Sequence, residues 1–319
     1  MNSEQPLQTK GTSKDIITGI AITLLIFTLS VYMPIIGFFC SLLLPLPVLF
    51  YRSKLGRRVG LIVPGGGLVI MVIALGGLTI DIVFFFELLL LGFLLSELFE
   101  MELSVEKTVL LACGGVILSG VLGLLFFSSI SGRGVSGLIS DYIAKNLEVT
   151  LALYEGMGMS EENLHLFSNS LDKIQYVLVR IVPAMVVAST LFVTWTNLLI
   201  ARPVFKKSGL SYPAFGTLKL WKAPDYLIWG LIGCGVLLLF PSRFLKLFGL
   251  NGLLILLTVY FFQGIAIVSY FFEKKRFPRL LRLLLYSLIA VQQILLLFVI
   301  GLGIFDMWLN FRKIGSSAE

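Results

Sequence analysis

The chain has 319 residues and a formal net charge of +7; 57% of its residues are hydrophobic and 13% are charged. Soluble globular domains average about 45–50% apolar and about 25% charged residues. This composition therefore excludes an ordinary soluble enzyme, a disordered chain and a nucleic-acid-binding domain. It is typical of a protein that is surrounded by lipid, so the bilayer is the first expected partner.

The residue types that most metal and catalytic sites need are scarce. The three cysteines, Cys40, Cys113 and Cys234, are isolated in apolar runs, and His165 is the single histidine. The chain has neither a GxxxxGK[ST] nor a GxGxxG motif, which are the usual nucleotide-binding patterns. We therefore expect no metal, no cofactor and no catalytic residue, and we predict that the protein is not an enzyme.

Apolar runs of membrane-crossing length recur along the whole chain. A bilayer core about 30 Å thick is crossed by about 20 apolar residues, and these must be helical because backbone polar groups cannot stay unpaired in hydrocarbon. Nine runs reach or approach this length: 16–33, 35–51, 59–76, 78–99, 108–129, 174–200, 226–241, 247–272 and 283–304. We predict an all-α, polytopic transmembrane helix bundle of about nine spans. The number is eight if 35–51 or 59–76, both interrupted by proline, re-enters without crossing.

The distribution of lysine and arginine predicts the orientation of the bundle. With a cytoplasmic N-terminus, 17 of the 25 basic residues fall in inside segments and 7 in outside segments. We therefore expect the N-terminus to be cytoplasmic, and nine spans would place the C-terminus outside. The basic tail Phe311–Lys313 favours the inside.

The predicted parts follow one another without a repeat. They are a cytoplasmic polar tail (1–15), a five-span bundle (16–129), an extracytoplasmic loop (130–173), a four-span bundle (174–304) and a C-terminal tail (305–319). Apolar residues recur at helical spacing in the acidic loop, which predicts an amphipathic helix on the membrane surface. Ser160 suits the N-cap of a second helix that begins at Glu161 and continues into the sixth span. The loop either packs over the bundle or forms a lid over an outward-facing cavity.

Three ionisable residues, Asp81, Glu87 and Arg180, fall inside predicted spans. A charge at the bilayer centre costs at least about 2.5–3.5 kcal/mol, so such residues need partners. At 1.5 Å per helical residue all three lie in the outer half of the membrane, and we predict that Glu87 meets Arg180. They form either a structural ion pair or a polar pocket for an ionic substrate; alternatively, Glu87 is a protonated carboxyl group or a proton relay.

Two amides, Asn251 and Gln263, share the eighth predicted span. Amides often form hydrogen bonds between membrane helices. These two either hold helices together or assist Asp81, Glu87 and Arg180 in binding a substrate.

Two predicted internal loops, 201–225 and 273–282, are strongly basic. They are either simple cytoplasmic anchors or docking sites for a cytoplasmic protein. The candidate docking residues are Arg202, Lys206, Lys207, Lys274, Lys275 and Arg276.

Motifs in the C-terminal third resemble a known family. They are Gly249-Leu250-Asn251, Tyr260 through Ala266, Gly303 through Trp308, and Phe311-Arg312-Lys313. They resemble the YybS-like family of bacterial multi-pass inner-membrane proteins of unknown function, over most of the chain. The resemblance implies a location in the bacterial inner membrane.

The N-terminal part carries a second resemblance, in Pro34-Ile35-Ile36-Gly37, Pro45-Leu46-Pro47-Val48-Leu49, Gly56, Gly60 and Pro64-Gly65-Gly66-Gly67. It is similar to the first helices of substrate-binding S components of energy-coupling-factor (ECF) vitamin transporters. This resemblance implies a small-molecule-binding bundle of six helices that works with separate ATPase and coupling subunits. S components often carry Ala-x-x-x-Ala on the first helix for docking; here Gly19 and Thr23 have the nearest such spacing, a departure from that pattern.

Together these observations predict a transport-related, small-molecule-binding protein without an ATPase of its own. Its partners would be ECF-type ATPase and coupling subunits. The alternative is a membrane scaffold that holds another cytoplasmic protein through the basic loops. The sequence identifies neither the ligand nor the direction of movement.

Overall fold

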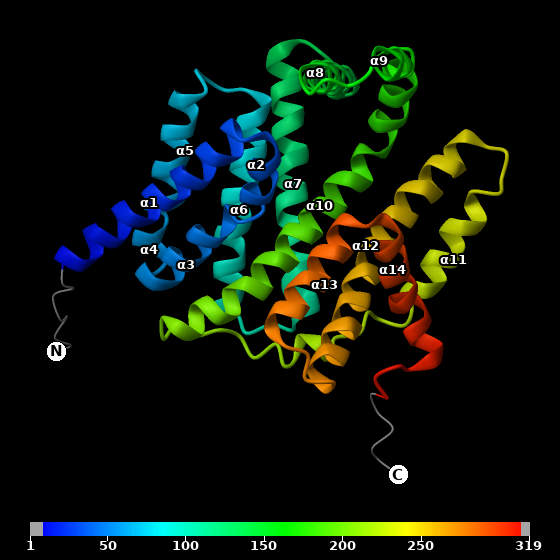
Figure 1. Ribbon diagram of the computed structural model, residues 1–319. Helices are drawn as coiled ribbons and strands as arrows, with labels where there is room; N and C mark the ends of the chain where they lie inside the picture. Colours follow the sequence, from blue (N-terminus) through cyan, green and yellow to red (C-terminus); the bar gives the residue numbers. More distant parts are fainter. Residues whose placement is uncertain (1–8, 314–319) are drawn as a thin grey trace. The chain divides into compact units, whose positions relative to one another are not determined.

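The computed structural model describes residues 9–313, and every regular element in that range is a helix (Figure 1). The elements are α1 (Thr9–Tyr32), α2 (Pro34–Ser41), α3 (Pro45–Leu55), α4 (Arg57–Gly60), α5 (Ile62–Ala74), α6 (Ile80–Glu100), α7 (Val105–Ser131), α8 (Val135–Gly156), α9 (Glu161–Ser168), α10 (Leu171–Lys207), the 3-10 helix η1 (Leu218–Leu220), α11 (Leu227–Leu237), α12 (Arg243–Lys274), α13 (Arg279–Val291) and α14 (Gln293–Leu309). The predicted all-helical class is confirmed.

The chain divides into two compact units, and the division falls within α10. Among the described residues, unit 1 contains 9–131 and Ser189–Phe215, and unit 2 contains Gly132–Ala188 and 216–313. All but the first two residues of the predicted external loop thus belong to unit 2, and the C-terminal half of α10 belongs to unit 1.

The predicted tails are partly helical. α1 begins at Thr9, within the predicted N-terminal tail, and α14 extends to Leu309, within the predicted C-terminal tail. Residues 1–8 and 314–319 of these tails lie outside the described part of the chain.

Proline and threonine determine where several helices of unit 1 begin. Pro34 starts α2 and Pro45 starts α3, at first-turn positions where proline's missing N–H removes no hydrogen bond. The Thr79 hydroxyl accepts a 3.4 Å hydrogen bond from the Ile82 N–H and caps α6. The predicted spans 35–51 and 59–76 are each divided into two helices, α2–α3 and α4–α5. Both pairs remain long and apolar enough to cross a membrane.

Unit 1 contains five complete candidate spans together with the C-terminal half of α10, whose candidate span it shares with unit 2. Its first helix packs inward through small residues. Thr23 is fully buried, and a Cβ atom at Gly19 would approach the Tyr51 ring at 2.9 Å. The Gly19–Thr23 face of α1 is therefore occupied by unit 1 itself.

Glycines bring the C-terminal helices of unit 2 into close contact. Gly249 and Gly252 of α12 lie against Cys234 of α11, and a Cβ atom at Gly252 would lie 2.5 Å from the Cys234 sulfur. Gly264 of α12 and Gly303 of α14 each face a backbone carbonyl of the other helix so closely that any side chain would overlap it. Small residues allow such close backbone approach between membrane helices.

The number of candidate spans is smaller than predicted. In the described chain seven helices are long and apolar enough to cross a membrane, or eight if the bent pair α13–α14 is counted as one span. The predicted span 226–241 contains only α11, whose 11 residues cover about 17 Å of a core about 30 Å thick. The predicted span 283–304 is divided between α13 and α14, which meet at Gln292 with a bend of 101°.

The bent pair begins and ends near one segment of unit 2. Glu273, which precedes α13, forms a 2.5 Å ion pair with Lys219. Arg312, which follows α14, donates hydrogen bonds of 2.9 Å to the carbonyl oxygens of Lys219 and Trp221. The described end of the chain therefore lies beside Lys219 and Trp221, which belong to the predicted basic loop 201–225. The side of the membrane on which the C-terminus lies stays a prediction.

The predicted external loop forms two helices, α8 and α9. α9 begins at Glu161 after Ser160, as predicted, although the Ser160 side chain makes no capping hydrogen bond. The predicted continuation into the sixth span is wrong, because α9 ends at Ser168 and α10 begins at Leu171. The Ser168 and Ser170 hydroxyls donate to the carbonyls of His165 and Leu166, an alternative to continuing the helix.

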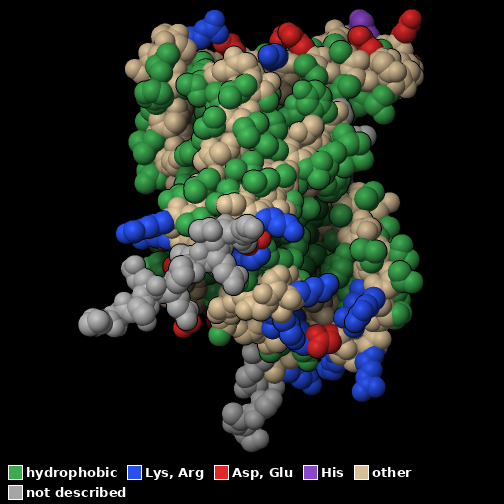
Figure 2. Space-filling model, turned by 90° about the vertical axis from the view of Figure 1, so that its left-hand side faces the viewer, with side chains coloured by type: hydrophobic (Ala, Val, Ile, Leu, Met, Phe, Trp, Pro, Cys, Tyr) green, Lys and Arg blue, Asp and Glu red, His purple; other side chains and the backbone are tan. Residues whose placement is uncertain are grey.

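The surface suits a lipid environment. Hydrophobic side chains cover most of the face shown in Figure 2, and charged side chains gather in separate groups. Large apolar residues are exposed on many helices, for example Leu110 of α7 at 72% and Leu284 of α13 at 67%. Exposed apolar area on this scale is unfavourable in water and favourable in hydrocarbon.

Candidate functional site

Glu87 lies in the middle of α6 and faces α7 at Ser119 and Gly120. A Cβ atom at Gly120 would lie 3.7 Å from the carboxyl carbon of Glu87, so the bare glycine makes room for the acid. Both carboxyl oxygens are buried and make no ion pair within the described chain; the Ser119 hydroxyl lies beside them, outside regular hydrogen-bond geometry. Burying a polar group without a partner costs free energy, so this carboxyl group needs a proton, a water molecule or a ligand.

Asp81, the second predicted acid, occupies a different environment. It lies in the first turn of α6 and is exposed. A helix N-terminus stabilises a negative charge, so Asp81 suits its position without a ligand. Six residues separate it from Glu87, which corresponds to about 9 Å along the helix and about 240° around it. The two acids therefore do not share one face of α6.

Arg180 of α10 interacts with its own helix. Its guanidinium donates a 2.8 Å hydrogen bond to the Tyr176 carbonyl and lies 3.3 Å from the centre of the Tyr176 ring. Arg180 belongs to unit 2 and Glu87 to unit 1, so their predicted pairing stays a prediction.

Asn251 of α12 bonds to both ends of one backbone turn of α10. Its Nδ2 donates to the Arg180 carbonyl at 3.0 Å, and its Oδ1 accepts from the Ala184 N–H at 3.0 Å. In a regular α-helix these two backbone groups would bond to each other. The preceding Pro183 disturbs that turn, because its ring crowds the backbone of a helix interior. A second Nδ2 hydrogen bond reaches the Leu247 carbonyl at 2.9 Å, so Asn251 joins α10 and α12 within unit 2.

Gln263 belongs to a separate buried network in unit 2. Its Oε1 accepts from the Ala223 N–H at 3.1 Å, and its Nε2 donates to Asp306 at 3.3 Å. Asp306 also forms a 2.7 Å ion pair with Arg312 and accepts from the Phe311 N–H at 3.0 Å. The structure therefore uses Gln263 to join α12, α14 and the segment before α11. Its predicted role in substrate binding stays a prediction, as does that of Asn251.

The candidate docking residues end two long helices and are exposed. They are Arg202, Lys206 and Lys207 at the end of α10 in unit 1, and Lys274, Lys275 and Arg276 at the end of α12 in unit 2. Their exposure allows contact with a partner.

In the described chain no group of three or more histidine, cysteine, aspartate or glutamate residues could hold a metal ion.

A comparison with known families matches most of the chain. Residues 21–307 match the family described as predicted membrane protein (DUF2232). The chain belongs to this family. It is also 24% identical, over 306 residues, to the uncharacterized protein YybS of Bacillus subtilis (strain 168), covering 92% of this chain and 95% of that protein. No solved structure matches the chain.

These matches confirm the resemblance to YybS and the multi-pass membrane class, and they assign no ligand. The DUF2232 match includes Glu87, Asn251, Gln263 and Asp306 and ends before Arg312. The buried ion pair of unit 2 thus joins an acid inside the matched region to a base beyond it.

Sequence reasoning missed the pairing of Asp306 with Arg312, and also a second ionic cluster in unit 1. Arg52 of α3 is fully buried, bonds to Glu97 and Glu100 of α6, and donates to the Ser96 carbonyl at 3.3 Å. Arg57 also lies 3.3 Å from Glu97. The available signal was the pair of acids at the end of an apolar span, opposite the basic residues of the preceding loop.

An aromatic cluster completes this end of unit 1. The rings of Phe99, Phe205, Tyr212 and Phe215 contact one another edge to face, with centroids 5.3–6.2 Å apart. The Tyr212 hydroxyl donates a 2.9 Å hydrogen bond to the Leu198 carbonyl, and burial raises the pKa of Tyr212 to about 12. Tyr212 thus remains a neutral donor that fixes the segment after α10.

Proposed function

We propose that this DUF2232 protein binds a small molecule as part of a transport process, and that unit 1 is the binding unit. One observation carries the proposal: the carboxyl group of Glu87 is buried without an ionic partner in the described chain, where only the Ser119 hydroxyl lies beside it as a polar neighbour. An ionisable residue inside a membrane that is not used by the fold is a candidate for function.

The composition of unit 1 supports this proposal. Its five complete candidate spans and its share of α10 come close to the six-helix bundle that the resemblance to ECF S components implies. Unit 2 would then be an addition to this binding unit. The protein would have no ATPase of its own and would act with separate subunits.

Docking to those subunits would use another surface than the one seen in S components. The small-residue pair nearest to their docking pattern, Gly19 and Thr23, is packed against unit 1 itself. A coupling subunit would have to contact a different face of unit 1, such as the exposed basic end of α10.

The environment of Glu87 favours a ligand with a nitrogen donor. A buried carboxylate is stabilised by a cation or by N–H groups, and α7 offers Glu87 only the Ser119 hydroxyl and the bare backbone at Gly120. We therefore propose a ligand that carries an amine or another N–H group and donates to Glu87.

A thermal-shift screen of the purified full chain against amine-containing metabolites tests the proposal. We expect a ligand that raises the melting temperature of the wild-type protein and has no effect on Glu87→Gln. Glu148→Gln, which alters an exposed acid of α8, should retain the response. Absence of any shift, or an equal shift in Glu87→Gln, would contradict the proposal.

The exposed basic residues support a scaffold as the second candidate function. Arg202, Lys206 and Lys207 extend from the end of α10 and are free to contact a cytoplasmic protein. Crosslinking in cells separates the two functions. Recovery of ATPase subunits supports transport, and recovery of an unrelated assembly that is lost on changing these residues to glutamine supports the scaffold.

A further inference from the structure

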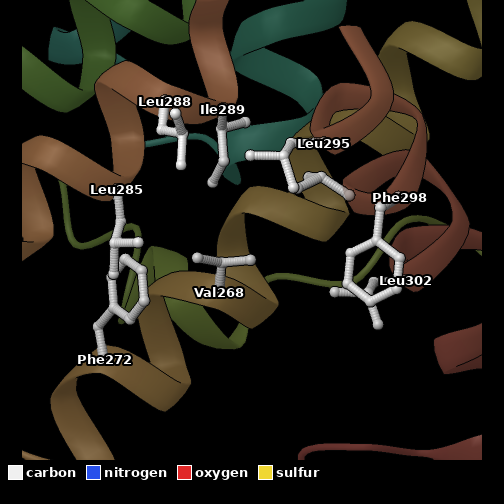
Figure 3. A pocket seen from close by; sticks show the side chains of 9 residues that line it. Val268, Phe272, Leu285, Leu288, Ile289, Leu295, Phe298 and Leu302 are labelled. Carbon is white, nitrogen blue, oxygen red and sulfur yellow. The ribbon is translucent and has the colours of Figure 1, made fainter. Parts of the chain in front are cut away.

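An apolar groove of about 230 Å³ lies between α12 and the bent pair α13–α14 of unit 2 (Figure 3). Its lining is entirely hydrophobic and includes Val268 and Phe272 of α12, Leu285 of α13 and Phe298 of α14. The labelled side chains approach one another around the empty centre in Figure 3. Phe298 is 62% exposed, so the groove is open to its surroundings on one side.

One end of the groove is strongly basic. Phe272, which lines the groove, is followed two residues later by the basic end of α12. Arg282 precedes the lining residue Leu285 by three residues, so the two lie on the same face of α13, one turn apart. The basic residues at this end are Lys274, Lys275, Arg276, Arg279 and Arg282.

The fold leaves most of this positive charge without a protein counterion. Glu273, the acid of this segment, forms a 2.5 Å ion pair with Lys219 and is also close enough to Arg282 to feel its charge, so it offsets only part of the basic cluster. Arg282 donates through Nε to the Phe277 carbonyl at 2.9 Å, and within the described chain its terminal nitrogens have no hydrogen bond. Lys274, Lys275 and Arg276 are exposed. An anion at this end would therefore meet several available donors.

Aromatic rings mark the boundary between the basic end and the apolar groove. The Phe272 ring lies 5.2 Å from that of Phe277 and 5.3 Å from that of Tyr286, measured between centroids. Aromatic side chains, tyrosine in particular, concentrate where the lipid headgroups meet the hydrocarbon. The Phe272 ring therefore contacts both Phe277, beside the basic residues, and Tyr286, next to a lining residue of the groove. This position suits the level at which a lipid headgroup meets its acyl chains.

We propose that this groove binds one acyl chain of an anionic phospholipid, whose phosphate is held by the basic residues that end α12 and begin α13. Two complementary features support this occupant: the open hydrophobic groove and the positive charge at one of its ends. A zwitterionic phospholipid would find the same groove but would gain less from the charge. Polybasic segments next to membrane helices generally attract anionic lipid headgroups.

Native mass spectrometry tests whether the basic end of the groove selects an anionic headgroup. The purified full chain is titrated with phosphatidylglycerol or with phosphatidylcholine of the same acyl chains. We expect phosphatidylglycerol to be retained at least about tenfold more tightly. Changing Lys274, Lys275 and Arg276 together to glutamine should weaken its binding about 100-fold, at about fivefold for each charge. The matched triple change of Arg202, Lys206 and Lys207 to glutamine, which removes equal charge from unit 1, should leave it unchanged.

Substitutions inside the groove test whether the acyl chain of the lipid binds there. Val268→Trp fills the groove and should reduce retention of phosphatidylglycerol at least about tenfold. Val236→Trp, on a 47% exposed face of α11, is the matched control and should have no effect. If Val268→Trp does not yield folded protein, Leu302→Phe makes the same test with a smaller change. Equal binding of the two lipids, an equal loss in the unit 1 triple variant, or unchanged binding after the groove is filled would each overturn the proposal.

Discussion

Asp306 and Arg312 form a 2.7 Å ion pair in which the exposed fractions of the two side chains are only 2% and 0%. The left-handed conformation of Asn310 between them, with φ of 40°, turns the chain back so that the arginine meets the acid it has just passed. The pair anchors the end of α14 to Gln263 of α12 and to the segment before α11. The ion pair thus holds the C-terminal end of α14 close to Lys219, which also binds Glu273 just before α13.

We predict that Asp306→Leu destabilises the protein strongly. The change leaves the Arg312 charge buried and uncompensated, which typically costs about 3–5 kcal/mol. The double variant Asp306→Leu with Arg312→Met should regain a large part of that loss. Titration with a denaturing detergent, followed by circular dichroism, measures the free energy of unfolding. Lys222→Gln, which breaks an exposed pair with Asp225, serves as the control and should cost at most about 1 kcal/mol.

We predict that Asn251→Leu costs about 1–3 kcal/mol, because it leaves the Arg180 carbonyl and the Ala184 N–H without the amide that bonds both. Pro183→Ala should suppress much of this cost, since a regular turn would allow the two backbone groups to bond to each other. The measurement is the stability of both single variants and the double variant. Purely additive losses would contradict this relation. Asn146→Leu, on the exposed face of α8, is the neutral control.

The sequence was sufficient to predict the helical membrane class and most span positions, because long apolar runs have few alternatives in a bilayer. It was not sufficient for the C-terminal third. The bend at Gln292 follows an unbroken apolar run with no proline at the break, so composition there favours a straight span. The hydrogen bonds from Arg312 to Lys219 and Trp221 join residues more than 90 positions apart, and no local pattern predicts them.

The candidate site was predicted in part, since Glu87 stood out as an acid in an apolar run. Its surroundings were not predictable, because they depend on which face of α7 meets α6. That glycine-rich face supplies Gly120, which accommodates the carboxyl group. The interhelical role held open for Asn251 and Gln263 agrees with their hydrogen bonds, but their backbone partners could not be named without the structure.

We predict that Glu87→Leu stabilises the ligand-free protein while abolishing any ligand response. Removing a buried carboxyl group that has no ionic partner and only the Ser119 hydroxyl beside it should raise the free energy of unfolding by about 1–3 kcal/mol. Detergent titration of the wild-type and variant proteins measures this change. A clear destabilisation would instead mean that Glu87 has a structural partner.

The predicted partner in that case is Arg180, and charge reversal tests it directly. Glu87→Arg and Arg180→Glu are compared alone and together in the same unfolding assay. If the two residues pair, each single reversal destabilises the protein and the double reversal recovers at least half of the loss. If Glu87 instead serves a ligand, the double variant remains as impaired as the sum of the single variants, because separated sites contribute additively.

We predict opposite effects for the same substitution at two neighbouring glycines of α14. Gly303→Ala places a methyl group against the Tyr260 carbonyl of α12, so the two helices must separate; overpacking of this kind costs about 1–3 kcal/mol. Gly301→Ala meets nothing within 4 Å and should stabilise the helix by about 0.5–1 kcal/mol. The unfolding free energies of the two variants measure the contrast. Equal effects would show that α12 and α14 do not depend on close backbone contact, and the geometry that closes the lipid groove would then need another explanation.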